Sequence, residues 1–386
     1  MFNVSTIELS TEALRNNLAF IRKVIGPKTG LCSVVKGNAY GHGIETFTPL
    51  AQRLGADCFA VYSASEAFQL KKHLQNGARI YIMGDADGNA LDWAVEHEVS
   101  FNIFEKNRLS QAIHAGKAQG KKALVHIEVE TGMHRTGFPL EELPHILELC
   151  RAYPDVIEVK GICSHLAGAE SQDNRLRIDA QKARFKEAVT IAERGGETAG
   201  TRHLACSAGI LNEPDTLYDM ARVGILHYGF WPNSETRERY MKAHKLTEDP
   251  LMRVIRWWSR IMSVATVPAG GFVGYGNDFQ AQVETRIATI PMGYAYGYAR
   301  SLSNTGHVLV RGKKAPVRGI VNMNCITVDV TGIEGVEKGD EAVLIGSQDG
   351  NNISVASFGD LSDQLNYELL TRLPHSIPRV VVEKHS

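Results

Sequence analysis

The chain has 386 residues, of which 44% are hydrophobic and 22% charged, and 42 Lys and Arg side chains nearly balance 43 Asp and Glu. These proportions are typical of a globular protein and exclude a disordered, collagen-like or coiled-coil chain, while the length suggests two domains. A formal net charge of −1 lacks the basic surplus of a nucleic-acid binder, and we find no apolar run long enough to span a bilayer.

The N-terminus and the cysteines bear on the compartment. The first residues show no charged segment followed by an apolar core, so no signal peptide is expected. The six cysteines form no CxxC pair, which predicts free thiols in a reducing cytoplasm and no metal site. They are Cys32, Cys58, Cys150, Cys163, Cys206 and Cys325.

Up to residue 230, short apolar runs alternate with stretches of helical spacing. Continuous apolar runs indicate strands covered on both faces, as in a parallel sheet. The eight runs are residues 31–35, 58–62, 80–83, 99–104, 124–129, 159–163, 203–206 and 223–228. Amphipathic helices are expected at residues 11–24, 66–75, 140–152 and 177–194. Eight such units predict an N-terminal (β/α)8 TIM barrel, with a doubly wound open sheet as the alternative.

Beyond residue 235, helical periodicity fades and short strands alternate with Gly, Asn, Asp or Pro. Strands are expected at residues 259–267, 286–291, 307–310, 315–321, 325–330, 341–345 and 379–382, and a helix at 355–365. This pattern predicts a mainly β C-terminal domain of barrel or sandwich type. The polar stretch 234–250 is expected to contain the boundary, which gives a barrel domain at residues 1–240 and a β domain at 241–386.

In a (β/α)8 barrel the active site lies at the C-terminal ends of the strands, where this chain has reactive side chains. Lys36 directly follows the first strand. It is either a Schiff-base lysine whose pKa is lowered by burial or a lysine that caps the strand in solvent. Glu128 and Glu130 alternate onto one face close to Arg135. They form either an active-site ion network or a structural salt bridge.

The later strands end in small and polar residues. His165 follows the sixth strand, and a lone histidine there is structural or catalytic. Ser207 follows the seventh strand, and Arg222 and Gly224 lie in the eighth. Backbone amides after strands seven and eight are where many barrels hold a phosphate. A lysine at the barrel mouth together with a phosphate site is the combination that pyridoxal phosphate requires.

Taken together, these motifs resemble the alanine racemase family, the pyridoxal-phosphate enzymes built from a barrel and a β domain. The segment VVKGNAYGHG at residues 34–43 differs from the family's VVKANAYGHG at one position. Further similar segments are TGMHRTGF at 131–138, PMGYAYGY at 291–298, the AP-to-Met segment at 315–323, and NYE at 366–368.

The resemblance implies a two-base interconversion of L- and D-alanine, which supplies D-alanine for peptidoglycan. Lys36 would hold pyridoxal 5'-phosphate and act as one base. Tyr275, in a GYG segment where the family has SYG, would act as the second base in the active site of the partner subunit. A homodimer with shared active sites is therefore expected, with a small amino acid as substrate and with no nucleic-acid or membrane partner.

The resemblance also assigns the residues around the cofactor and substrate. Arg222 would face the ring nitrogen and His165 would pack on the ring. Arg135 would hold the cofactor's phenolic oxygen or the substrate carboxylate. The full cofactor set is Lys36, Tyr40, His165, Ser207, Arg222, Gly224, Ile225 and Tyr367, and the substrate set is Arg135, Met323 and the partner's Tyr294.

Several positions depart from the family pattern. Glu128 stands where the family often has a lysine, carbamylated in some members, and it supplies a negative charge directly beside Arg135. None of the departures removes a proposed base or cofactor ligand. A racemase of serine or larger amino acids is therefore the main alternative, followed by a related decarboxylase, a non-catalytic pyridoxal-phosphate carrier and a cofactor-free barrel enzyme. The other departures are Gly37, Cys206, Tyr296, Ile320 and Asn324.

Overall fold

The computed structural model describes residues 3–194, 200–354 and 366–385, which form two compact units. The barrel unit comprises Leu14–Gly37 and Thr48–Met252, and the β unit comprises Met1–Ala13, Asn38–Phe47 and Arg253–Ser386. Three helices begin in one unit and end in the other, namely α1 (Thr11–Ile25), α2 (Lys36–Tyr40) and α3 (Ile44–Arg53). Within the described ranges, none of the helices has the length and apolar character needed to cross a membrane.

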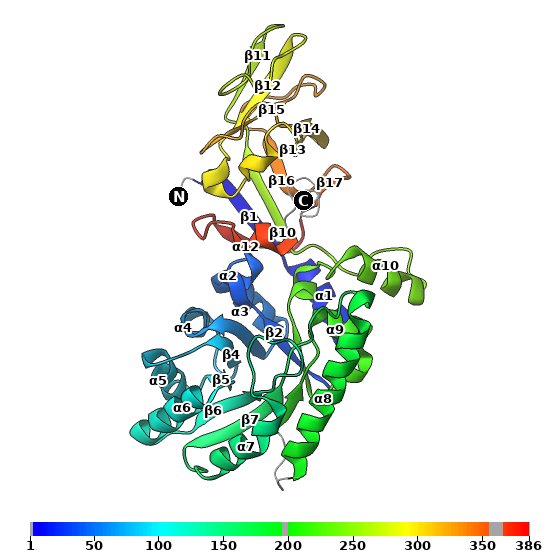
Figure 1. The fold of residues 1–386 in the computed structure, drawn as a ribbon. Helices are drawn as coiled ribbons and strands as arrows, with labels where there is room; N and C mark the ends of the chain where they lie inside the picture. The colour runs from blue at the N-terminus through cyan, green and yellow to red at the C-terminus, as the bar shows by residue number, and fades with distance from the viewer. Residues whose placement is uncertain (1–2, 195–199, 355–365, 386) are drawn as a thin grey trace. The chain divides into compact units, whose positions relative to one another are not determined.

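The barrel unit contains eight parallel strands with helices around them (Figure 1). In ladder order the strands are β8 (Thr201–His203), β7 (Ile157–Cys163), β6 (Ala123–Glu128), β5 (Ser100–Ile103), β4 (Arg79–Asp85), β3 (Cys58–Ser63), β2 (Gly30–Val34) and β9 (Met220–Val223). The two end strands also meet, because Asp219 N–H donates to Arg202 O at 3.1 Å and Arg222 N–H donates to Ala205 O at 2.9 Å. This closure confirms the predicted TIM-like barrel, and the open doubly wound sheet is wrong.

Most helices of this unit bury apolar side chains along one side, whereas α10 (Ser234–Ala243) buries only Thr236. In the longest helix, α8 (Arg175–Arg194), the buried positions include Ile178, Phe185 and Val189, which recur at helical spacing. The helices are α4 (Ala64–His73), α5 (Asn89–Glu96), α6 (Lys106–Gln119), α7 (Leu143–Arg151), α8 (Arg175–Arg194), α9 (Ser207–Asn212) and α10 (Ser234–Ala243). Short 3-10 turns are η1 (Leu140–Glu142), η2 (Gln172–Asn174), η3 (Pro214–Thr216) and η4 (Ile225–Tyr228).

The β unit is built from two sheets. The larger has the order β14-β13-β16-β10-β1-β18 with β17 beside β16, and the smaller has the order β11-β12-β15. The strands are β1 (Ser5–Ser10), β10 (Ile255–Arg260), β11 (Ser263–Val267), β12 (Thr285–Ile290), β13 (His307–Val310), β14 (Lys313–Pro316), β15 (Ile326–Asp329), β16 (Glu341–Gln348), β17 (Asn351–Ile353) and β18 (Arg379–Val382). The remaining elements are η5 (Tyr294–Tyr296), η6 (Arg300–Leu302) and α12 (Asn366–Thr371).

Strand β1 (Ser5–Ser10) lies in the sequence range expected for the barrel domain, yet it pairs with strands of the β unit. β1 runs antiparallel to β10 and parallel to β18. Residues 234–250, expected to contain the boundary, include α10 of the barrel unit, and the chain enters the β unit at Arg253. The pairing of β1 depends on residues about 250 and 370 positions away, and no local pattern encodes it.

Several expected strands differ from those observed. The run at 223–228 is wrong as a strand, because β9 ends at Val223 and the following apolar residues form the buried turn η4. An apolar run alone does not distinguish a buried helical turn from a strand. The strand expected at 203–206 is β8, which ends at His203. The strand expected at 259–267 is two strands, β10 and β11, which belong to different sheets. The strand expected at 315–321 ends at Pro316, and the helix expected at 355–365 lies outside the described residues.

Candidate active site

The barrel interior is polar near the carboxyl ends of its strands. Directly paired residues on parallel strands face the same side of the sheet, so the pairs Asn102 with His126 and Glu128 with Cys163 project together. Arg222 is paired with Cys32 in the same way. Side-chain hydrogen bonds join Asn102 to Glu128 and Cys163. A second group of hydrogen bonds joins His126 to His203 and His203 to Arg222.

Lys36 follows β2 and is the first residue of α2. Its side chain reaches solvent, yet protein atoms surround much of it, and this partial burial lowers the pKa of Lys36. The positive charges of Arg135 and Arg222 lower that pKa further, while the Glu66 carboxylate acts in the opposite direction. A lowered pKa increases the unprotonated fraction of the amine, which is the form that condenses with an aldehyde.

Arg222 is the buried cation at the centre of the site. Its guanidinium donates to His203 O at 2.9 Å and to Ser164 O at 2.6 Å, and it also binds Nδ1 of His203. A second contact, of 3.4 Å, joins it to Nδ1 of His165. Because a guanidinium only donates, the Nδ1 atoms that face it are unprotonated. Burial and the charge of Arg222 lower the pKa of His165 to about 3, so this ring is neutral.

The contacts of Arg222 also determine which ring nitrogen of His203 carries the proton. Since His203 accepts at Nδ1, its proton lies on Nε2, which donates to Nδ1 of His126 at 2.9 Å. Burial, with Arg222 nearby, lowers the pKa of His126 to about 3. The ring of Tyr81 lies 4.4 Å from that of His126, and its hydroxyl donates to Oδ1 of Asn102.

Glu128 ends β6 and is held by two hydrogen bonds. Asn102 Nδ2 donates to one carboxylate oxygen at 3.1 Å and Thr136 Oγ1 to the other at 2.9 Å. Burial raises the pKa of Glu128, whereas these hydrogen bonds and the charges of Arg222 and Arg135 lower it. The net effect is a raised pKa, so a negative charge of Glu128 beside Arg135 stays a prediction.

Four residues of these two groups were missed by the sequence analysis, namely Tyr81, Asn102, His126 and His203. For Tyr81, Asn102 and His126 the available signal was a polar residue between two apolar ones, whereas His203 ends the short polar strand β8. That signal does not say whether the residue faces the barrel interior or the helices, because either face of a barrel strand is covered.

The candidate phosphate site lies where α9 and η4 begin. Gly224 N–H donates to Ser207 Oγ at 3.0 Å, which joins the two chain segments. Ser207 is the first residue of α9 and Ile225 the first of η4. The first N–H groups of a helix have no acceptor within that helix, and such groups bind phosphate oxygens. The donor set therefore fits a phosphate ester.

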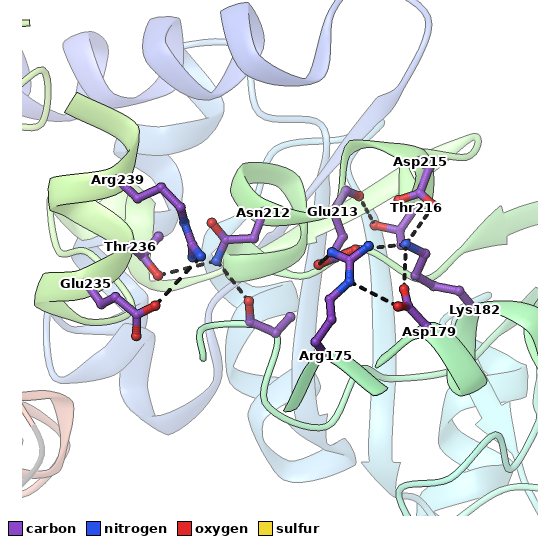
Figure 2. A network of polar contacts seen from close by, with 11 residues as sticks. Arg175, Asp179, Lys182, Asn212, Glu213, Asp215, Thr216, Glu235, Thr236 and Arg239 are labelled. Atoms are coloured by element: carbon purple, nitrogen blue, oxygen red, sulfur yellow. Dashed lines mark hydrogen bonds and ion pairs between the residues drawn. The ribbon is translucent and has the colours of Figure 1, made fainter. Parts of the chain in front are cut away.

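A charged network fixes α9 against α8 (Figure 2). The Glu213 carboxylate, almost fully buried, accepts from Arg175 Nη1 at 3.0 Å and from Lys182 Nζ at 2.8 Å. Lys182 also contacts Asp215 at 2.7 Å and Asp179 at 3.4 Å. Since Glu213 directly follows the last residue of α9, these contacts hold the helix whose first residue is Ser207.

A left-handed turn follows Lys36. Residues Gly37, Asn38, Ala39 and Tyr40 have φ values of 61°, 55°, 53° and 51°. Consecutive left-handed residues are unfavourable for L-amino acids, and such strain persists where the surroundings impose it. The Gly37 N–H is held at 2.6 Å by Oε1 of Glu66, a residue that the sequence analysis did not single out.

The other predicted residues belong to the β unit. Tyr275 lies between two glycines with positive φ, and 73% of its surface is exposed. Tyr294 and Met323 come together, because the N–H groups of Tyr294 and Ala295 donate to the carbonyls at 322 and 323 at 3.1 and 3.0 Å. Tyr40 belongs to the segment Asn38–Phe47 and Tyr367 to α12, so their cofactor contacts stay predictions.

The chain matches known proteins over almost its whole length. The model of the alanine racemase N-terminal domain matches residues 9–232, and that of the alanine racemase C-terminal domain matches residues 254–381. An alanine racemase from Leptospira interrogans is 34% identical over 380 residues, which is 98% of this chain and 96% of that protein.

Solved structures give the same result. The alanine racemase of Streptomyces lavendulae has a TM-score of 0.89 and 28% identity, with 99% of this chain and 98% of that chain covered. The alanine racemase of Bartonella henselae, solved with covalently bound pyridoxal phosphate, has a TM-score of 0.82 and 26% identity, with 98% and 99% covered. With both family models matched across the two units, this chain belongs to the alanine racemase family.

Proposed function

We propose that this chain interconverts L- and D-alanine with pyridoxal 5'-phosphate, using Lys36 and Tyr275 of the partner subunit as the two bases. The observation that carries the proposal is the arrangement at the carboxyl end of the barrel. There, the lowered pKa of Lys36 occurs together with the buried cation of Arg222 and with the first residues of α9 and η4, which the hydrogen bond from Gly224 N–H to Ser207 Oγ joins.

The residues at the barrel mouth fit each part of the cofactor. The N–H groups at Ser207 and Ile225, with the hydroxyls of Ser207 and Tyr40, would hold the phosphate. Gly224 would support this site through its N–H, which donates to Ser207 Oγ. Lys36 would bind the carbonyl carbon. When bound, pyridoxal phosphate delocalises the negative charge that develops at the substrate's α-carbon.

Arg222 would determine how far that charge spreads. Its guanidinium stays protonated and donates to acceptors on Ser164, His165 and His203, so it keeps a ring nitrogen facing it unprotonated. Charge build-up in the ring is thereby limited, which disfavours transamination. The neutral ring of His165 would pack beside the cofactor without adding a charge.

Racemisation needs one base on each face of the α-carbon. The Nζ of Lys36 takes or returns the proton on one face. Tyr275 would act on the other face, from a second copy, and its large exposed surface supports a role at a subunit contact. We therefore propose a homodimer with shared sites, with Tyr294 of the partner subunit and Tyr367 near the entrance and Met323 near the substrate.

Glu128 would do the work that a carbamylated lysine does in other members of the family. Its carboxylate is already held by Asn102 and Thr136 and needs no modification to be negative. Arg135, oriented by this charge, would bind the substrate carboxylate or the cofactor's phenolic oxygen. A cytoplasmic location stays a prediction, supported by the six free cysteines.

Mixing inactive variants tests the shared site. Lys36→Ala and Tyr275→Phe should each be nearly inactive, and subunit exchange between them should restore about a quarter of the activity, since half of the dimers then have one intact site. Lys36→Ala mixed with Arg222→Met is the matched control, because both residues belong to the same chain's site and no intact site forms. Equal recovery in both mixtures, or an active monomer, would overturn the proposal.

A further inference from the structure

The backbone after Lys36 is held by a side chain from another strand–helix unit. Glu66 lies in the first turn of α4, where Ser63 is the N-cap and its Oγ accepts from Glu66 N–H at 3.3 Å. The two carboxylate oxygens of Glu66 accept hydrogen bonds from backbone amides outside α4. One accepts from Gly37 N–H at 2.6 Å and the other from Tyr62 N–H at 2.9 Å.

These two hydrogen bonds join the ends of neighbouring strands at the active-site edge. Gly37 follows β2 by three residues, and Tyr62 is the fifth residue of β3. Gly37 also begins the left-handed turn at 37–40. An ionised acceptor makes a shorter and stronger hydrogen bond than a neutral one, so the carboxylate fixes the point from which the Lys36 side chain departs.

The charge of Glu66 matters as well as its hydrogen bonds. Three charged side chains act on Lys36, and two of them, Arg135 and Arg222, are positive. Glu66 is the negative member of this set and favours the protonated amine, while burial and the two arginines favour the neutral amine.

We infer that Glu66 is a positioning residue for Lys36, which anchors the backbone at Gly37 and offsets the positive charges of Arg135 and Arg222 at the amine. The inference deepens the proposed function, on which its catalytic meaning rests. The reactivity of Lys36 and the hydrogen exchange at Gly37 can both be measured without catalytic turnover.

The test measures the reactivity of Lys36 in the full-length protein after hydroxylamine treatment and dialysis. Labelling with trinitrobenzenesulfonate from pH 6 to 10, read by peptide mass spectrometry, gives the pH midpoint of Lys36. Glu66→Gln should lower this midpoint by about 0.5 to 1 unit, equivalent to roughly three- to tenfold faster labelling below the midpoint. Hydrogen exchange in the peptide that contains Gly37 should also become faster.

Two controls separate positioning from helix capping. Glu235→Gln removes a carboxylate from the first turn of α10, which also has a side-chain N-cap, and should leave the Lys36 midpoint unchanged. Ser63→Ala removes the cap of α4 but keeps the Glu66 carboxylate, and should lower stability without moving the midpoint. If Glu66→Gln does not fold, Glu66→Asp keeps the charge but is too short to reach both amides, and faster exchange at Gly37 is expected.

An unchanged midpoint and unchanged exchange in a folded Glu66→Gln protein would overturn the inference, and Glu66 would then be only an acidic residue in the first turn of α4. This outcome is distinct from a failure of the proposed function. A wild-type protein that racemises no amino acid would refute the function, while a shifted Lys36 midpoint would still support the contact.

Discussion

Replacing Gly37 by alanine tests the left-handed turn that follows Lys36. Gly37 has a φ of 61°, and the three residues after it are also left-handed. A side chain with a Cβ loses about 1–2 kcal/mol in this conformation, while the stiffer unfolded chain of the alanine variant returns about 0.4–1 kcal/mol. The net loss is about 0–1.6 kcal/mol, with a central value of about 0.8 kcal/mol.

Gly120 provides a matched control within the same unit. It ends α6 with the same φ of 61°, and a Cβ added there meets no atom within 4 Å. Gly120→Ala therefore reports the conformational cost alone. Because 1 kcal/mol changes Tm by about 2–4 °C in a unit of roughly 150–250 residues, both variants should unfold below the wild type, by about 2–3 °C at the central value and by about 6 °C at most.

Thermal unfolding at one scan rate, followed by circular dichroism, measures both variants. The family pattern has alanine at the position of Gly37, so Gly37→Ala should keep its activity despite the lower Tm. If Gly37→Ala is as stable as the wild type while Gly120→Ala is not, the turn at 37–40 is not left-handed in solution and the reasoning is refuted.

Three further predictions concern buried charge. Lys182→Met should lower the free energy of unfolding by about 2–3 kcal/mol, because it removes one cation from the buried Glu213 carboxylate. Adding Glu213→Gln in the double variant should restore most of the lost free energy. A coupling energy near zero between the two substitutions, measured by urea unfolding, would contradict this. Burial lowers the folded-state pKa of His126 to about 3 and of His227 to about 4. The unfolded chain, with histidine pKa values near 6.5, binds more protons, so stability should fall below pH 6.5 by up to about 1.4 kcal/mol per pH unit and histidine. A stability that is flat from pH 7 to 5 would refute that account. Glu128→Gln should reduce activity, and added bicarbonate should change neither enzyme; full activity in the variant would disprove the proposed charge.

The sequence predicts the barrel well because each βα unit is local. Every continuous apolar run up to β7 contains an observed strand, since a buried parallel strand has few polar residues on either face. Long-range pairing is different. The partners of β1 are β10 and β18, and no spacing near residues 5–10 indicates them.

The residues of the candidate site that lie in sequence motifs were predictable, whereas those that only the tertiary fold brings to the site were not. Lys36 and Arg222 stand near strand ends, so the sequence singles them out as candidates. Tyr81 and Asn102 contribute through inward registers that are set only when the eight strands close. Glu66 looks like an ordinary first-turn acid in the sequence, and only the fold brings it to the Gly37 amide.

The most direct test of the account is the product of the reaction. The purified protein with pyridoxal phosphate is incubated with single L-amino acids, and the enantiomers are separated by chiral chromatography. We expect D-alanine as the dominant product, with no racemisation by Lys36→Ala. Failure to racemise any amino acid, or release of carbon dioxide in place of a D-enantiomer, would contradict the central claim.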